Sequence, residues 1–385
     1  MKPNRRSSPV KATGIVLLAA LAVLTAAGSI ACEYFDPMDP LSREPREPDS
    51  TITWERVIKP SLGSAGNGYD AGMCVQQTVD GGYVIAGSME PDVDKNSDVW
   101  LVKTDSFGNV GWEETVGGGE ADMGCYVEQT ADRGYIVVGS KEFDRGGGSL
   151  DFDLWLIKVK PDDQGEGEIE WEYPFGEIGT NEMGACVRCT DDGGHIIAGE
   201  KVSQTTGYVE LWLLKTDGEG SLEWEESFAG SDSVCGECVG QTMPDLGYVA
   251  AGVSWSDSSE NAYLIKTDTD GNMDSAWTPN PKEFGTPEEQ DGAFYVQQTS
   301  DGGYILTGQT GLFGASAIDA LLVKLDVAGN SFIVLNPEKF VPHAFSRLNI
   351  LTFEDLIQKS NRIITDRRQH AGGGTEICFI CRNKG

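Results

Sequence analysis

The chain has 385 residues, with 61 acidic and 29 basic side chains and a formal net charge of −32. This surplus of carboxylates excludes a protein that binds nucleic acid through its phosphates, because Lys and Arg make most phosphate contacts. The 49 glycines favour many tight turns over a helical bundle, and 39% hydrophobic residues suffice for a packed core, which excludes wholesale disorder.

Residues 1–31 are predicted to be an export signal peptide. They carry four basic residues and no acidic one, and their apolar run over 15–27 is shorter than the roughly 20 residues of a membrane span. The small residues before Cys32 fit a cleavage site, so Cys32 is the expected lipidation site at the mature N-terminus. The protein is then extracytoplasmic and lipid-anchored to a membrane or cell surface, with simple secretion as the alternative. Residues 32–50, rich in prolines and acids, predict a stiff, solvated tether.

A repeat fills residues 51–336. One segment, CVQQTVDGGYVIAGS in its first copy, occurs five times, and each copy is followed by a second run of the type VWLVKTD. A Gly-containing turn and a Trp follow this run, and Trp54 precedes the first copy. The interval between successive aromatic positions is 53 to 59 residues. The copies begin at Cys74, Tyr126, Cys186, Cys238 and Tyr295.

Each repeat unit predicts four short strands, of which the first starts at the Trp. Asp-Gly-Gly joins the next two strands as a hairpin, because Gly tolerates the positive φ of such turns. Four strands in about 55 residues, repeated several times, are typical of a β-propeller blade. We therefore expect an all-β fold, a propeller of four-stranded blades. Five blades are expected, or six if 332–340 begins a further one, and the order of strands from centre to rim stays open.

The combined pattern QQT-x-DGGY followed by KTD-x-x-GN-x-x-W resembles the repeat of exported bacterial and archaeal β-propeller proteins, many of them uncharacterised lipoproteins. The resemblance covers residues 54 to about 335. It implies the architecture and the export, and it names neither a ligand nor a reaction. Arg133 and Leu246 depart from the turn pattern in the second and fourth copies.

The recurring aromatic and cysteine positions favour packing over ligand binding. Large aromatics at the same place in every unit indicate contacts between blades. The position that alternates Cys with Tyr predicts a buried slot, and equivalent cysteines of neighbouring blades are expected to lie too far apart for a disulfide. Cys186 and Cys189 should face opposite sides of one strand, which disfavours zinc, whereas Cys235 and Cys238 could form a local disulfide. His195 is expected at a strand start.

Topology indicates which face binds a partner. The short DGG and TDxxGN turns should lie at one end of the blades, and the longer, variable, acidic loops at the other, where binding usually resides. Acidic residues recur eight positions before the recurring Thr, and they predict either an acidic ring near the channel mouth or a solvated acidic surface. They are Asp70, Asp122, Glu182 and Asp291, with Val234 breaking the series.

Residues 337–385 form an atypical basic C-terminal tail with eight basic and five acidic residues, which leaves residues 32–336 with a net charge of −39. The tail is interpreted as an appended segment or as the result of a truncation within a sixth blade. An amphipathic helix is expected after Thr352. The alternation over 268–274 resembles a calcium loop without its bidentate Glu, so Ca²⁺ is the single cofactor suggested, and the metal ligands stay unknown.

The sequence thus predicts a monomeric, non-enzymatic binding or scaffold module at the cell surface. Its partner would be a protein, a glycan or a cation, and the membrane is reached only through the N-terminal lipid. No catalytic residue is singled out. The alternatives are an exported propeller enzyme of the lyase, glycosidase or quinoprotein type, which would need an axial pocket with converging charged groups, and an incomplete relative without activity.

Overall fold

The computed structural model describes residues 54–60, 69–90, 96–145, 150–161, 165–204, 206–228, 233–255, 260–285, 290–311, 319–331, 333–335, 366–369 and 375–381. The predicted signal peptide, Cys32, the tether and the helix expected after Thr352 lie outside these residues. Every regular element within them is a strand. A search of the same residues for a helix long and apolar enough to cross a membrane finds none.

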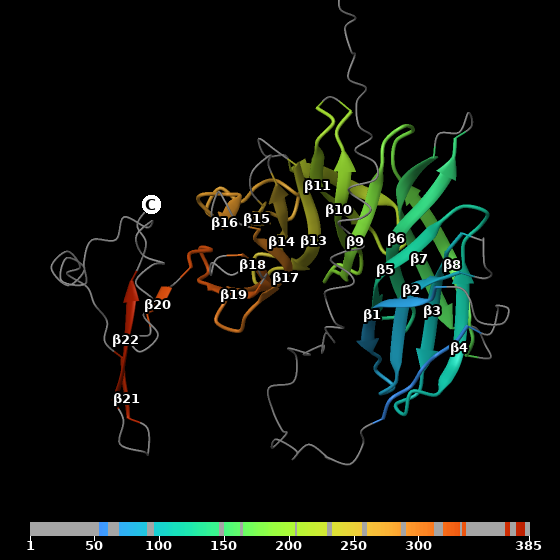
Figure 1. Ribbon diagram of the computed structural model, residues 1–385, viewed down its shortest axis with the longest axis horizontal. Helices are drawn as coiled ribbons and strands as arrows, with labels where there is room; N and C mark the ends of the chain where they lie inside the picture. The colour runs from blue at the N-terminus through green and yellow to red at the C-terminus, as the bar shows by residue number, and fades with distance from the viewer. Residues whose placement is uncertain are drawn as a thin grey trace, which may run out of the picture.

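Five antiparallel sheets form the blades of a β-propeller and lie side by side in chain order (Figure 1). Blades 1 to 4 have four strands and blade 5 has three among the described residues. The expected all-β propeller is therefore confirmed, with five blades. The strands are β1 (Ala71–Gln77), β2 (Tyr83–Met89), β3 (Asp98–Thr104), β4 (Val110–Val116); β5 (Asp122–Gln129), β6 (Tyr135–Asp144), β7 (Leu150–Pro161), β8 (Gly167–Phe175); β9 (Glu182–Cys189), β10 (His195–Val202), β11 (Val209–Thr216), β12 (Leu222–Phe228); β13 (Ser233–Gln241), β14 (Tyr248–Trp255), β15 (Glu260–Thr267), β16 (Lys282–Phe284); β17 (Gly292–Gln298), β18 (Tyr304–Thr310) and β19 (Asp319–Leu325).

The blade is offset by one strand from the repeat unit predicted from the sequence, which started at the Trp-bearing strand. Each sheet begins with the CVQQT-type strand. In the first three blades the sheet ends with the strand that contains the Trp, which follows the second short turn. The first strands pack against one another in series, β1 on β5, β5 on β9, β9 on β13 and β13 on β17. They therefore line the centre, and the Trp-bearing strands form the rim.

The Trp of each rim strand packs on the next blade. Trp112 of blade 1 contacts Tyr135 of blade 2, with ring centroids 5.6 Å apart. The Trp of a rim strand also covers a turn of the next blade. In blade 3, the ring of Trp224 lies 2.8 Å from the position that a Cβ on Gly271 of blade 4 would take. Packing between blades, as the sequence predicted, accounts for the recurring aromatics. The equivalent pairs are Trp171–His195, Trp224–Tyr248 and Trp277–Tyr304.

Trp54 occupies the same position on blade 1, although it precedes every blade in the chain. Its ring lies 5.9 Å from that of Tyr83, and its Nε1 donates to the carbonyl of Ser106 at 3.2 Å. Trp224 makes the same bond, also at 3.2 Å, to Thr269 in the equivalent turn of blade 4. Trp54 thus stands where the rim strand of a preceding blade would place its Trp. In a closed ring that preceding blade is blade 5, which has three strands among the described residues.

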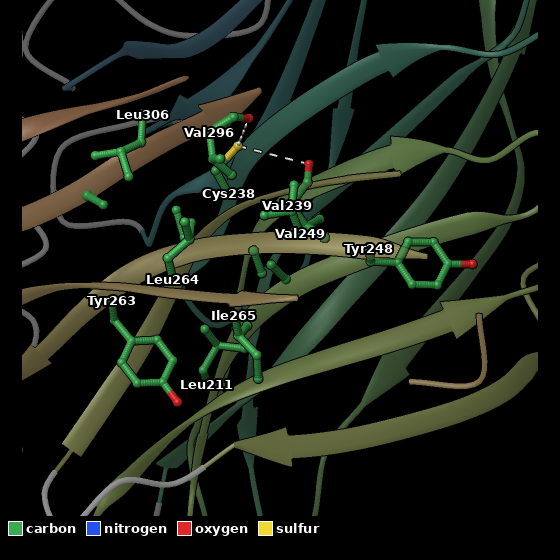
Figure 2. Packing of buried hydrophobic residues seen from close by; sticks show 14 of the residues in the cluster. Leu211, Cys238, Val239, Tyr248, Val249, Tyr263, Leu264, Ile265, Val296 and Leu306 are labelled. Atoms are coloured by element: carbon green, nitrogen blue, oxygen red, sulfur yellow. Dashed lines mark hydrogen bonds between the residues drawn. The ribbon is translucent and has the colours of Figure 1, made fainter. Parts of the chain in front are cut away.

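The largest core lies between blades 3, 4 and 5. Figure 2 shows Val239, Val249, Leu264 and Val296 gathered around Cys238, each contributed by a strand of blade 4 or 5. All of them are buried, because adjacent sheets face each other across this layer.

A sixth sheet contains no repeat motif. It joins β20 (Ile333–Leu335) to β22 (Thr375–Cys381), which also pairs with β21 (Asp366–Gln369). The segment at 333–335 therefore pairs with the tail and does not begin a blade of the repeat type.

Candidate functional site

Residues of three blades meet where the first strands converge. Arg188 of β9 donates from Nη2 to the hydroxyl of Tyr295 in β17, at 3.2 Å. Its guanidinium carbon lies 5.1 Å from the ring centroid of Tyr126 in β5 and 5.9 Å from that of Tyr295. Blades 3 and 5 are not neighbours, so a side chain can join them only at the centre of the propeller. We call Tyr126, Glu128, Arg188 and Tyr295 the hub.

Glu128 supplies the opposite charge at the hub. It is 8% exposed, and its Oε2 accepts a hydrogen bond from the backbone N–H of Cys189 at 3.0 Å. Burial raises the pKa of Glu128, and the positive charge of Arg188 acts in the other direction. The positive charge of Arg188 therefore opposes the cost of burying Glu128, and the hydrogen bond to Cys189 couples β5 to β9.

A β-bulge interrupts every first strand immediately before the Cys or Tyr slot. In blade 4 the pairing shifts between Gly236 and Cys238, so Glu237 is left outside the ladder. A bulge turns its extra residue away from the sheet, and bulges are common beside functional sites. The residues at this position are Met73, Cys125, Ala185, Glu237 and Phe294.

Two carboxyl groups and a thiol lie close to one another at the level of the bulges. Burial and then the charge of Glu237 raise the pKa of Glu200 to about 7, and burial raises the pKa of Glu237 as well. Burial, followed by Glu237, raises the pKa of the Cys125 thiol to about 12. Cys235 donates from Sγ to Oε1 of Glu237 at 3.4 Å. Because Cys125 belongs to blade 2 and Glu237 to blade 4, this group also lies near the axis.

These groups have definite chemical capacities. Glu200 and Glu237 are each half-buried, and protein atoms surround both carboxyl groups. A carboxyl group with a pKa of about 7 can hold or release a proton near neutral pH, and the ionised pair attracts cations. Neither residue was predicted as a site residue from the sequence. The available signal was a Glu within an otherwise apolar strand.

The short-turn end of the blades (the turns 78–82 and 105–109 of blade 1 and their equivalents) is fixed by a repeated ion pair. In blade 3 the Thr190 hydroxyl donates to Asp192 at 2.5 Å, and Lys215 Nζ lies 3.0 Å from Asp192 and 2.9 Å from Glu223. Burial acts to raise the pKa of Asp192, but Thr190, the Gly194 amide and Lys215 outweigh it and lower the pKa to about 2. The same Thr, Asp and Lys meet in the other blades, at Thr78/Asp80/Lys103, Thr130/Asp132/Lys158, Thr242/Asp245/Lys266 and Thr299/Asp301/Lys324.

Three of the four acids expected to form an open ring are buried. Asp122, Glu182 and Asp291 are 2%, 0% and 1% exposed, whereas Asp70 is exposed. Asp122 accepts the Glu142 amide at 3.1 Å, and Glu182 accepts the Glu177 amide, which ties loops to strand starts. Burial raises the pKa of Asp122 to about 6, and burial also raises the pKa of Glu182. These three acids therefore do not belong to an exposed acidic surface, and two of them, Asp122 and Glu182, anchor loops from within.

Other residues singled out in the sequence have structural surroundings. Asp268 uses Oδ1 to accept the amides of Asp270 and Asn272, at 3.0 and 2.9 Å, so it closes a turn of the same kind as Asp105 does in blade 1. His195 begins β10 as expected, and burial, then Lys158 and Lys215, lower its pKa to about 4. A search of the described part of the chain finds no group of three or more metal-ligating side chains.

No protein-family model matches the chain, and no curated protein matches it in sequence. Solved structures with a similar arrangement include a thermostable family-43 glycoside hydrolase, with 10% identity, a TM-score of 0.35, and coverage of 69% of this chain and 91% of that one. A sucrose-6-phosphate hydrolase from Lactobacillus gasseri has 10% identity and a TM-score of 0.41 over 68% of this chain and 59% of its own. A levansucrase from Bacillus subtilis has 10% identity and a TM-score of 0.36 over 66% and 83%. At these values the likeness does not bear on activity.

Proposed function

We propose that the protein is an exported β-propeller, lipid-anchored through Cys32, that acts as a binding or scaffold module at the cell surface. Its partner is a protein, a glycan or a cation that binds at the long-loop end of the blades (the connections Met89–Asp98 and Val116–Asp122 of blade 1 and their equivalents). The basic and apolar N-terminus, with small residues before Cys32, supports export and anchoring.

The difference between the two ends of the blades carries the proposal. At the short-turn end each blade has the same compact turns, held by the Thr–Asp–Lys contacts. At the long-loop end the connections differ in length and composition from blade to blade, on a scaffold that holds them in place. Residues 32–336 carry a net charge of −39, which attracts positively charged partners over about 8 Å at physiological salt.

Charge reversal at the two ends tests the proposal. Asp70, Glu120 and Asp144 lie at the long-loop end, and the buried acids are left intact because reversing them would disturb the fold. The matched control changes Asp191, Glu219 and Asp270, three exposed acids in short turns, by the same total charge. The probes are a polylysine peptide and Ca²⁺, each titrated against the full chain at two salt concentrations.

We expect the triple change to Lys at the long-loop end to weaken binding of at least one probe about tenfold and to reduce its salt dependence. The control triple should change the same affinity about twofold or less. Equal losses in both triples would mean that net charge alone attracts the probe, and a larger loss in the control would place the binding face at the short-turn end.

The axial carboxyl groups favour a second candidate, an exported propeller enzyme of the glycosidase type. Glycoside hydrolysis uses two carboxyl groups, one with a raised pKa that serves as the acid, and Glu200 with Glu237 offers such a pair. Hydrolysis of an aryl glycoside that is lost in Glu200→Gln would identify this candidate.

A further inference from the structure

Two cysteines of adjacent blades approach the same backbone carbonyl. Cys186 of β9 and Cys238 of β13 each place Sγ 3.9 Å from the same atom, the carbonyl oxygen of Val239. Each thiol also shifts the pKa of the other. Figure 2 shows Cys238 with its contacts to the carbonyls of Val239 and Val296. Equivalent cysteines of neighbouring blades were expected to lie too far apart for a disulfide, whereas the sulfur atoms of this pair share a neighbouring atom.

A close approach of two backbones explains the contact. A Cβ built on Gly236 would lie 2.7 Å from the carbonyl oxygen of Gly199 in blade 3, so side chains are excluded at this point. Gly199 pairs with Gly184 in β9. Cys238 lies two residues beyond Gly236, and Cys186 lies two residues beyond Gly184, the ladder partner of Gly199.

No other pair of adjacent slots offers two thiols. Cys74 donates to the carbonyl of Val127 at 3.8 Å, and the slot residue of that next blade is Tyr126. Cys238 reaches Val296 in the same way, beside the slot residue Tyr295. The interface between blades 3 and 4 is therefore the place where the repeat brings cysteine to cysteine.

The competing cysteines are directed elsewhere. Cys189 packs in the core between blades 2 and 3, whereas Cys186 packs in the core shared by blades 3, 4 and 5. Cys235 donates to Glu237 at 3.4 Å. Cys186 and Cys238, in contrast, share a contact with the carbonyl of Val239.

The surroundings also activate one of the two thiols. The hydrogen bond with Cys186, and then the charge of Arg188, lower the pKa of Cys238 to about 7 against the opposing effect of burial. A lower thiol pKa increases the fraction of thiolate, which is the form that attacks a disulfide.

We propose that Cys186 and Cys238 form a disulfide bond that joins blades 3 and 4 at the centre of the propeller. The oxidant is a small-molecule or protein disulfide, which an extracytoplasmic compartment supplies, so the occurrence of the bond in the cell depends on the proposed export. During folding, before the two sulfurs are buried, the Cys238 thiolate attacks one sulfur of the oxidant and releases a thiolate. Cys186 then loses its proton and attacks Cys238 Sγ, which forms the intramolecular bond and releases the second thiolate. The oxidant gains two electrons, and its two thiolates take up the protons.

Peptide mapping of the full chain tests the bond. The protein is refolded with oxidised and reduced glutathione, its free thiols are alkylated, and it is cleaved with trypsin and a Glu-specific protease without reduction. Cleavage after Arg188 separates Cys186 from Cys189, and cleavage after Glu237 separates Cys235 from Cys238. Because the oxidant is supplied, the result is independent of export and of any partner.

We expect a linked pair of peptides that contain Cys186 and Cys238 and weigh two hydrogens less than the separate thiols. Reduction of the wild type should lower Tm by about 8–16 °C, because the bond closes a loop of 51 intervening residues. Cys186→Ser and Cys238→Ser should abolish this shift, and Cys74→Ser, at the same slot in blade 1, should retain it. Alkylation of both cysteines in the oxidised folded protein, or linkage of either to another cysteine, would overturn the proposal.

Discussion

Replacing Arg188 with Leu is expected to lower the free energy of unfolding by about 3–5 kcal/mol, measured by urea denaturation at neutral pH. Arg188 provides the positive charge beside the buried carboxylate of Glu128, and its guanidinium joins β9 to Tyr295 of blade 5. Leu would leave Glu128 buried without an opposite charge. It would also remove the hydrogen bond between blades 3 and 5.

The loss in Arg188→Leu should depend on pH. Burial already raises the pKa of Glu128, and removal of Arg188 would raise it further. A carboxyl group whose folded pKa exceeds its unfolded value binds a proton more strongly in the folded state, so stability falls as pH rises above about 4.5. The variant should therefore be closest to wild type near pH 4.5 and should lose stability as pH increases through the raised pKa.

The matched control is the double variant Arg188→Leu with Glu128→Gln, which removes both charges. It should be more stable than Arg188→Leu by at least about 1 kcal/mol at neutral pH and should lose the additional pH dependence. An effect below about 1 kcal/mol in the single variant, or a double variant that is no better than the single one, would show that the pair does not hold the hub together.

Trp277→Ala should cost about 3–5 kcal/mol, as expected when a large buried aromatic is truncated. The indole is 2% exposed, and its ring lies 5.5 Å from Tyr304 of blade 5. It also covers Gly329, where a Cβ would lie 2.2 Å from the ring. The substitution thus opens a cavity between two blades. The midpoint and the slope of urea denaturation provide the measurement.

Trp54→Ala provides the comparison, because Trp54 occupies the equivalent position on blade 1 but is 40% exposed. With less area buried, its loss should be roughly half that of Trp277→Ala. No effect at all would mean that the N-terminal segment does not contribute to blade 1. A loss for Trp277→Ala no larger than that for Trp54→Ala would contradict the assignment of the rim tryptophans to packing between blades.

The sequence was sufficient to predict the blades because the patterns that mark their strands and turns are local. Asp-Gly-Gly marks a hairpin, the alternation in YVIAG marks a strand, and the recurrence of both reveals the number of units. The Cys and Tyr slot was predicted to be buried, which holds for Cys186 and Cys238, at 0% and 2% exposed, whereas the other three slot residues are half-buried. What the pattern left open was which strand lies at the centre, because every strand of a blade has an apolar face toward a neighbour.

The functional groups were less accessible from the sequence because they depend on contacts between blades. Glu237 acquires its position from a bulge, and one extra residue in a strand changes no pattern that spacing can detect. Asp122 and Glu182 were predicted to belong to an acidic ring near the channel mouth or to a solvated surface, but both are buried and anchor loops from within. The meeting of Thr190, Asp192 and Lys215 required the pairing of β10 with β11.

The offset between repeat and blade bears on how such a chain can change its length. A repeat unit counted from Trp to Trp starts with the rim strand of one sheet and continues with three strands of the next. Gain or loss of one unit by recombination would therefore rejoin parts of two sheets at equivalent points. Each blade at the new junction would still contain four strands. Because the Trp of a rim strand packs on the next blade, as Trp112 and Trp224 do, the new junction would also inherit this contact. Recombination breakpoints could thus fall at any strand or turn of the repeat, and the number of blades could change without the design of a new contact.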